Sequence, residues 1–227
     1  MLGLFECSPL VKRALLAVCC LSAAAPASMY DVNLLVNPSF EYINASGILM
    51  WSATGEAETW TYLDKTELPK PVDDPLEFRF LRGGQAMLST LSQSVDLNAV
   101  FSDIDAGLVT CHLEAYLGGS GSQEDHAAVT VEFLDAADAV LDSAVIGPVT
   151  AADRGNATIL LPRETDVAVP AGTRSAVVTI AMTRANGTVM NEGYADLVEL
   201  TLVPEPGALT VLAVGSGLLL LRRRKRR

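Results

Sequence analysis

Histidine and cysteine, which often carry nucleophilic or metal chemistry, are scarce in this sequence of 227 residues. Outside the first 27 residues the only thiol is Cys111, and it is followed directly by His112. A thiol nucleophile needs a histidine base beside it in space, but neighbouring residues of a strand point to opposite faces. We therefore expect Cys111 to be a core residue. The second histidine, His126, follows Glu124 and Asp125 and is expected in a solvated loop.

Motifs of the common hydrolytic and phosphate-binding enzymes are missing from the chain. The sequence has no G-x-S-x-G, no H-E-x-x-H and no glycine-rich phosphate loop. Carboxylates are abundant enough for a glycosidase pair, but nothing in their spacing singles one out. We predict a protein that is not an enzyme.

Aromatic side chains are the residues best suited to binding here, since their faces stack on sugar rings while polar neighbours bond the hydroxyls. Trp60 and Tyr62, which lie among threonines, are the leading ligand-binding candidates, and Trp51 lies nearby. Tyr116 and the polar segment 123–126 are weaker candidates. The alternative is core packing, which we favour for at least one tryptophan.

The charge of the chain limits its partners. The formal net charge is −11, and the two ends hold eight of the sixteen basic residues. The remaining part is therefore still more acidic, and it would repel nucleic acid and anionic membranes. We expect no nucleic-acid partner. Solubility outside the cell is the main interpretation of this charge, and cation binding is a second one.

The last 25 residues have three parts in a fixed order. Pro204, Glu205 and Pro206 come first, an apolar run follows from 207 to 221, and a basic cluster ends the chain with Arg222, Arg223, Arg224, Lys225, Arg226 and Arg227. The prolines oppose regular structure. The basic cluster is retained on the cytoplasmic side of a membrane by the positive-inside rule.

This order of parts resembles the PEP-CTERM sorting signal of bacterial surface proteins. The resemblance implies a Gram-negative, exopolysaccharide-producing bacterium and an exosortase-type sorting peptidase that cuts near Pro204, Glu205 and Pro206. The alternative is a plain tail anchor. A stable spanning helix needs about 20 apolar residues, and the run 207–221 is shorter and contains glycines.

The other end of the chain predicts export. Lys12 and Arg13 precede an apolar stretch, and Ala25-Pro26-Ala27 offers the small residues of a signal-peptidase site. We expect a signal peptide over 1–27, one domain over 28–202 and the sorting segment over 203–227. The expected partners are the secretion translocon and the sorting peptidase. The protein would pass through the inner membrane to the cell surface or extracellular matrix.

The middle of the chain predicts an all-β domain, a single jelly roll or β-sandwich, between an N-terminal signal-peptide helix and a short C-terminal apolar helix. Short apolar runs with period-two alternation are separated by Gly, Pro, Asn and Asp. We expect a long loop over 64–77. The expected strands are 34–36, 84–97, 108–117, 127–134, 140–146, 157–161, 175–184 and 194–203.

The two ends of this domain resemble the galactose-binding-like jelly roll of many carbohydrate-binding modules. The opening N-L-L-V-N-P-S-F-E over 33–41 and the closing Y-A-D-L-V-E-L over 194–200 carry the resemblance, and Gly84-Gln85-Ala86 adds a match. The resemblance implies a structural calcium ion held by Glu41 and Asp196. It departs from the family at Leu197, where a second acidic residue is common. The alternative is that Glu41 caps a turn and Asp196 bonds backbone amides.

Two functions follow from these patterns. One is a lectin-like module that holds extracellular polysaccharide, and the other is an acidic structural protein of the surface with no small ligand. A fold of this type hosts unrelated roles, so the binding residues must decide between them.

Overall fold

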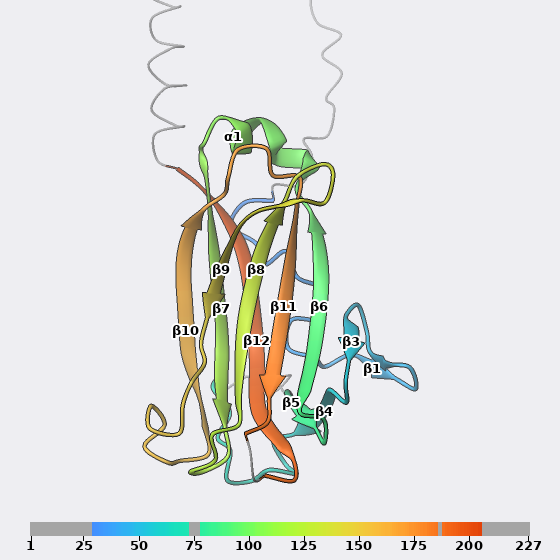
Figure 1. The fold of residues 1–227 in the computed structure, drawn as a ribbon, viewed down its shortest axis with the longest axis vertical. Coiled ribbons are helices and arrows are strands. Elements are labelled where there is room, and N and C mark those ends of the chain that lie inside the picture. Colours follow the sequence, from blue (N-terminus) through green and yellow to red (C-terminus); the bar gives the residue numbers. More distant parts are fainter. Residues whose placement is uncertain (1–28, 73–77, 186–187, 206–227) are drawn as a thin grey trace, which may run out of the picture.

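The computed structural model describes residues 29–72, 78–185 and 188–205, which form a sandwich of two five-stranded antiparallel sheets (Figure 1). The first sheet has the order β10 (Ile159–Ala168), β7 (Val109–Gly119), β12 (Asn191–Pro204), β5 (Arg79–Gly84) and β4 (Glu58–Thr61). The second has the order β3 (Ser52–Thr54), β6 (Leu88–Asp96), β11 (Ser175–Thr183), β8 (His126–Leu134) and β9 (Val140–Ile146). A small hairpin, β1 (Ile43–Asn44) with β2 (Gly47–Ile48), lies to the side, and η1 (Asn98–Val100) with α1 (Phe101–Asp105) connects β6 to β7.

Most connections after β5 cross from one sheet to the other, and every strand pair is antiparallel. This is the jelly-roll arrangement of a β-sandwich. The all-β, single-sandwich prediction is therefore confirmed.

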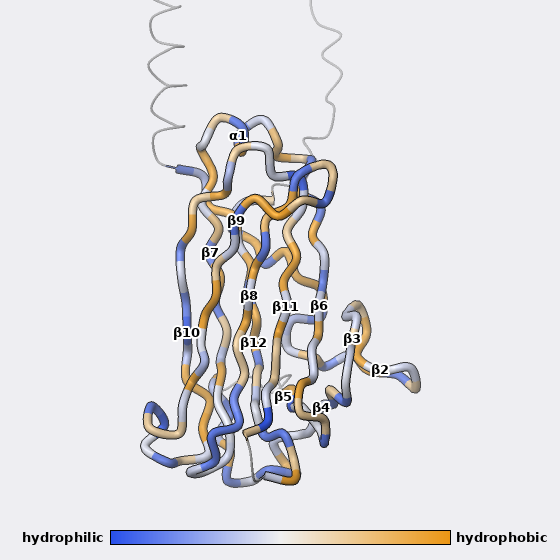
Figure 2. Tube along the Cα trace, viewed as in Figure 1, coloured by the Kyte–Doolittle hydropathy of each residue, from blue (hydrophilic) through white to orange (hydrophobic). Residues whose placement is uncertain are grey.

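The core lies between the two sheets, where side chains of period two meet. In β8 the inward residues Val129, Val131 and Phe133 are fully buried, and in β11 so are Val178 and Ile180. Half-buried and buried positions alternate along both strands, and Figure 2 shows the hydrophobic residues along them. Each fully buried aliphatic or aromatic side chain contributes about 1.5–3 kcal/mol, so this alternation supplies the main driving force for the sandwich. Cys111 is fully buried in the same core, as predicted.

The strand boundaries correct the predictions at several places. The expected strand 157–161 begins at Ile159 and continues to Ala168, as β10. Segment 34–36 is not a strand: the chain there pairs with β12 through isolated bridges at Tyr30 and Asn33 and separate hydrogen bonds, and φ is positive at Asp31 and Asn37. The expected strand 84–97 is divided, because Gly84 ends β5 at φ +72. A Cβ at Gly84 would lie 2.1 Å from the Glu56 carbonyl oxygen.

A further correction concerns the last strand. β12 continues to Pro204, whose Cα partner is Val109, so regular pairing includes the first proline of the predicted sorting segment. The Glu205 N–H then donates to the Leu108 carbonyl, with an N···O distance of 2.9 Å. The last strand therefore ends one residue beyond its expected end at 203. Within 64–72 the chain forms no strand or helix, in agreement with the loop prediction.

The first and last described segments lie together at the α1 end of the sandwich. The Asp31 N–H donates to the Leu202 carbonyl at 3.0 Å, and the Tyr30 hydroxyl donates to Asp103 in α1 at 2.7 Å. In the described ranges, no helix has the length and apolar character needed to cross a membrane. The predicted signal peptide, and the tail from Pro206 through the basic cluster, lie outside the described residues.

Candidate ligand-binding face

The outer face of the first sheet, which is turned away from the core, carries two different groups of side chains. Toward the end far from α1 lies the aromatic half: Trp60, Tyr62, Leu68, Phe80, Tyr116, Leu160 and Tyr194. Toward α1 lies the acidic half: His112, Glu114, Glu164, Asp166 and Glu199. β7 belongs to both, since its outward residues run from His112 and Glu114 to Tyr116. The sheet therefore presents one continuous surface with an aromatic and an anionic part.

Trp60 lies on the edge strand β4 and is half-buried. The guanidinium carbon of Arg82 lies 3.6 Å from the Trp60 ring centroid, and an Arg82 nitrogen lies 2.6 Å from Glu58 Oε1. Arg82 is 3% exposed, so its charge is neutralised by Glu58 and its plane stacks on the indole. Trp60 is thus held rigidly while part of its ring remains in solvent.

Tyr62, which was predicted to bind a ligand, is buried in the structure. It is 7% exposed, and its ring centroid lies 5.2 Å from that of Phe80, which in turn contacts Tyr194. The Tyr62 hydroxyl donates to Asp196. Tyr62 is therefore a buried residue beneath the surface of the aromatic half. The half-buried aromatic residues of this half are Trp60 and Tyr116.

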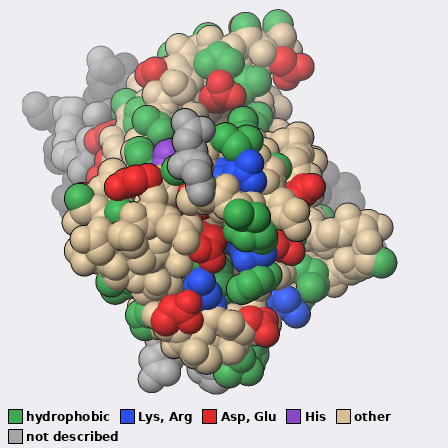
Figure 3. All heavy atoms as spheres, turned by 60° about the horizontal axis from the view of Figure 1, so that its bottom comes forward, with side chains coloured by type: hydrophobic (Ala, Val, Ile, Leu, Met, Phe, Trp, Pro, Cys, Tyr) green, Lys and Arg blue, Asp and Glu red, His purple; other side chains and the backbone are tan. Residues whose placement is uncertain are grey.

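Segment 62–72, which follows β4, covers part of the aromatic half and is tied down by Lys65. The Lys65 ammonium lies 3.0 Å from Glu192 Oε1 and 3.1 Å from Glu67 Oε1, and it lies over the Tyr194 ring. Burial alone would lower the pKa of Lys65, but hydrogen bonds to Glu192 and Glu67 outweigh it and raise that pKa. Figure 3 shows this end of the molecule, where acidic and basic side chains lie among hydrophobic ones.

The two carboxylates predicted to hold calcium have other partners in the structure. Glu41 Oε1 accepts from the backbone N–H groups of Phe78 and Arg79, both at 2.7 Å. Asp196 is fully buried and accepts from Tyr62 and, at 2.8 Å, from the Leu197 N–H. The bond from the Leu197 N–H matches the alternative drawn from the sequence for Asp196, whereas Glu41 binds the start of β5 rather than capping a turn. The calcium assignment stays a prediction.

The remaining sequence candidates are structural. Trp51 is 8% exposed and donates from Nε1 to the Asn37 carbonyl at 3.0 Å, so it is the core tryptophan. Within segment 123–126, Asp125 is fully buried and accepts from the backbone of Ala185 and Glu192.

The acidic half was missed as a site by sequence reasoning. His112 Nδ1 lies 2.8 Å from Asp166 Oδ1, and His112 Nε2 lies 3.6 Å from Glu114 Oε2. The hydrogen bond to Asp166 raises the pKa of His112 above its usual value. His112 and Asp166 also border a groove of about 280 Å³, which is completed by Thr110, Val203, Pro204 and Glu205. The signal was present as His112-x-Glu114, because residues two apart in a strand share a face.

Comparison with known proteins agrees with the fold and assigns no family. No family model matches the chain, and no curated protein matches its sequence. The enzymatically active domain of bacteriophage CBA120 tailspike protein 4 is 14% identical, with a TM-score of 0.53, over 76% of this chain and 22% of that one. The chain thus spans about a fifth of the tailspike structure, and at this identity the likeness is one of fold.

Two smaller solved structures match at lower scores. TmCBM61, solved with β-1,4-galactotriose, is 14% identical with a TM-score of 0.44, over 77% of this chain and 99% of that one. The CBM22-1 xylan-binding domain of Paenibacillus barcinonensis Xyn10C is 16% identical with a TM-score of 0.44, over 78% and 99%.

Proposed function

We propose that this protein is a non-enzymatic surface or matrix protein that contacts extracellular polysaccharide through the aromatic half of its first sheet. The supporting observation is the pair of half-buried rings, Trp60 and Tyr116, which pack on the same buried cluster. Rings held on a rigid sheet lose little conformational entropy when a sugar stacks on them. Glu58, two residues before Trp60 in β4, lies on the same face and supplies a carboxylate for hydroxyls. The carbohydrate-binding modules above, at a TM-score of 0.44, add no argument.

The route to the surface is proposed from the sequence. The leader over 1–27 would direct export through the translocon, and the tail from Pro204 to Arg227 would be handled by an exosortase-type peptidase. The protein would then reside at the cell surface or in the extracellular matrix of a Gram-negative bacterium.

A second candidate function is an acidic structural protein with no small ligand. Two observations favour it. Arg82 stacks on Trp60, and the rings of Tyr62, Phe80 and Tyr194 are buried. A plain tail-anchored envelope protein remains a third, less favoured alternative.

A glycan array decides between the first two. Residues 28–205, which include the whole of β12, are applied with and without Ca²⁺, and the producer's own polysaccharide is included. We expect Trp60→Ala to reduce binding by roughly 5- to 150-fold, since loss of a stacking ring costs about 1–3 kcal/mol.

The matched control is Val145→Ala, an exposed apolar residue of β9 in the second sheet. It should bind as the wild type does. Absence of binding to every glycan, by a protein whose melting curve shows it folded, would favour the structural protein.

A further inference from the structure

Three neighbouring strands bring the acidic half together in two rows. In one row Glu114 of β7 lies opposite Glu164 of β10 and Glu199 of β12. In the next row His112 lies opposite Asp166 and Thr201. Like charges directly opposite each other destabilise a sheet. Among the described residues, the ion pairs in this half join only His112 to carboxylates, so the surface has an excess of negative charge that a cation would neutralise.

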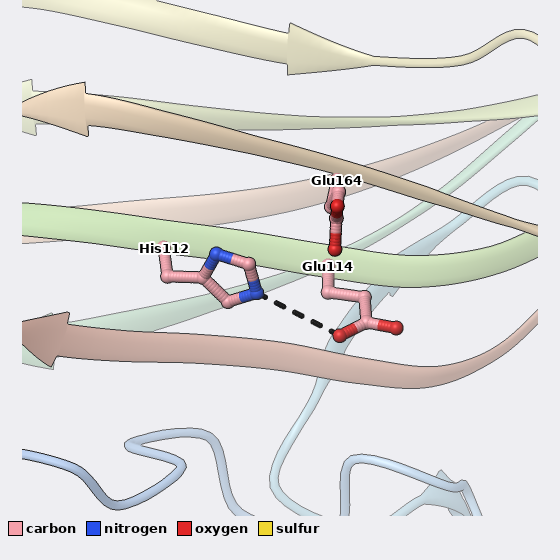
Figure 4. A group of neighbouring side chains, drawn as sticks. All are labelled: His112, Glu114 and Glu164. Atoms are coloured by element: carbon pink, nitrogen blue, oxygen red, sulfur yellow. Dashed lines mark ion pairs between the residues drawn. The ribbon is translucent and has the colours of Figure 1, made fainter.

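His112 is oriented as a metal-binding histidine is. Its Nδ1 faces Asp166 Oδ1 at 2.8 Å, which fixes a proton on Nδ1 in the neutral ring. The lone pair of Nε2 then points toward Glu114, as Figure 4 shows. A carboxylate that bonds the far nitrogen is the usual outer partner of a histidine ligand. A lone pair that faces a carboxylate oxygen at 3.6 Å is repulsive unless a cation or a proton lies between them.

The spacing of the donor atoms suits one ion. His112, Glu114 and Glu164 each offer an atom, and the three atoms lie within 4.8 Å of one another. Zinc takes nitrogen at about 2.0–2.1 Å and carboxylate oxygen at about 2.0–2.2 Å. The donors therefore need to approach by roughly 1 Å, and Glu164 is exposed and free to turn. Both His112 and Glu114 come from β7, so two of the three ligands are held by a rigid strand.

We propose that His112, Glu114 and Glu164 form a site for a divalent transition-metal ion, Zn²⁺ above all, with Asp166 as the residue that positions His112. One imidazole and two carboxylates are a donor set for zinc rather than for calcium, which takes six to eight oxygens. Three protein ligands leave a coordination position open to solvent or to a ligand on the same face. The site is separate from the aromatic half and from the calcium predicted at Glu41 and Asp196.

Isothermal titration of residues 28–205 with Zn²⁺ tests the proposal. This form excludes Cys7, Cys19 and Cys20, which would compete for the metal. We expect one zinc per chain, with affinity reduced at least tenfold in His112→Gln and in Glu164→Gln. Asp166→Asn should weaken binding by 10–100-fold, as is usual for an outer partner. Ca²⁺ at the same concentration should not displace the zinc.

His126→Gln is the matched control, because His126 is the other histidine of the chain and its Nδ1 pairs with the Glu124 carbonyl. It should bind zinc as the wild type does. Co²⁺ gives an independent readout, since its visible absorption should lose intensity in His112→Gln but not in His126→Gln. No binding, or equal binding by the wild type and His112→Gln, would overturn the site. His112 would then be a protonated imidazolium that links the carboxylates.

Discussion

At the scale of the residue, buried polar side chains hold the loops of the sandwich by accepting or donating several backbone bonds at once. Asp125 uses both oxygens: Oδ1 accepts from the Ala185 N–H at 2.7 Å and Oδ2 from the Glu192 N–H at 2.8 Å. Arg154 makes the opposite arrangement and donates to four backbone carbonyls, those of Val149, Ala157, Gly121 and Gln123. Each of these side chains satisfies groups that would otherwise be buried without partners.

The first prediction concerns Asp125. Asp125→Asn keeps one acceptor oxygen but turns an amide donor toward a backbone N–H. We expect the free energy of unfolding to fall by about 1–3 kcal/mol, as measured by urea denaturation. Glu124→Gln changes the exposed neighbour and should have no effect beyond about 0.5 kcal/mol. Equal stabilities for the two variants would contradict the role of Asp125.

The second prediction concerns calcium at Glu41 and Asp196. An ion bound only by the folded chain at 100 times its Kd adds about 2.7 kcal/mol. Removing divalent ions with EGTA should then lower the Tm, and Ca²⁺ alone should restore it. The double variant Glu41→Ala with Asp196→Ala should lose this response. Tyr62→Phe removes a partner of Asp196 but keeps the carboxylate, so it should retain the response. An unchanged wild-type Tm in EGTA would reject the ion.

Residue roles were predictable from the sequence only where burial alone decides them. Cys111 could be placed in the core from its strand pattern, and its burial raises the pKa of the thiol to about 12, which keeps the thiol protonated. Trp60 and Tyr62 could not be told apart, because the partners that separate them, Arg82 and Asp196, come from distant strands. Glu114 and Glu164 lie opposite each other because of the register between β7 and β10. This register could not be predicted from the sequence of either strand alone.

At the scale of the element, segment 62–72 is a loop fastened over a sheet by one buried ion pair. The side chains of Lys65 and Glu192 are each 12% exposed. Burial alone would raise the pKa of Glu192, but hydrogen bonds from Lys65 and Tyr194 outweigh it, and the pKa lies below 4.5. A carboxylate with a lowered pKa stabilises the fold above its unfolded pKa and loses that contribution as the pH falls through the folded value.

The third prediction follows from this ion pair. As the pH falls below about 4.5, the free energy of unfolding of the wild type should drop more steeply than that of Glu192→Gln, which has no such proton to take up. Urea denaturation at a series of pH values between about 3 and 7 measures how steeply the free energy of unfolding of each protein falls with pH. This range is sufficient because the pKa of Glu192 is lowered. Glu67→Gln, the exposed partner of Lys65, should keep most of the wild-type slope. If the free energy of unfolding falls equally steeply with pH in the wild type and in Glu192→Gln, the ion pair does not contribute to acid denaturation.

Elements with strong alternation were predictable, and short edge elements were not. The expected strands 127–134, 140–146 and 175–184 match β8, β9 and β11 to within one residue. β3 and β4 have three and four residues and sit at the sheet edges, so they show too few positions for a period to emerge. β5 has the sequence R-F-L-R-G-G and is buried on both faces. Its buried Arg82 is neutralised by Glu58. For this reason the strand shows no alternation of polar and apolar residues.

At the scale of the whole molecule, the described chain begins and ends beside α1, and β12 lies in the middle of its sheet between β7 and β5. The fourth prediction is processing at both ends. Intact-mass measurement on protein extracted from the producing cells should give a chain that starts near residue 28 and lacks Arg222 to Arg227. Because Pro204 pairs with Val109 and Glu205 bonds Leu108, we expect the cut on the C-terminal side of Glu205. A surface species that still carries the basic cluster would support a plain anchor instead.

The central position of β12 also decides how the molecule would bear a mechanical load. Tension applied at Glu205 pulls along the axis of β12, while its ladder bonds to β7 run perpendicular to the strand. The pull therefore shears ten paired positions together, whereas a peeling force would open them one at a time. A force between a ligand bound on the outer face of the first sheet and an attachment at Glu205 would thus be carried by this one sheet. The contacts between the two sheets would not be loaded. Under tension applied at Glu205, the domain would therefore behave as a stiff link.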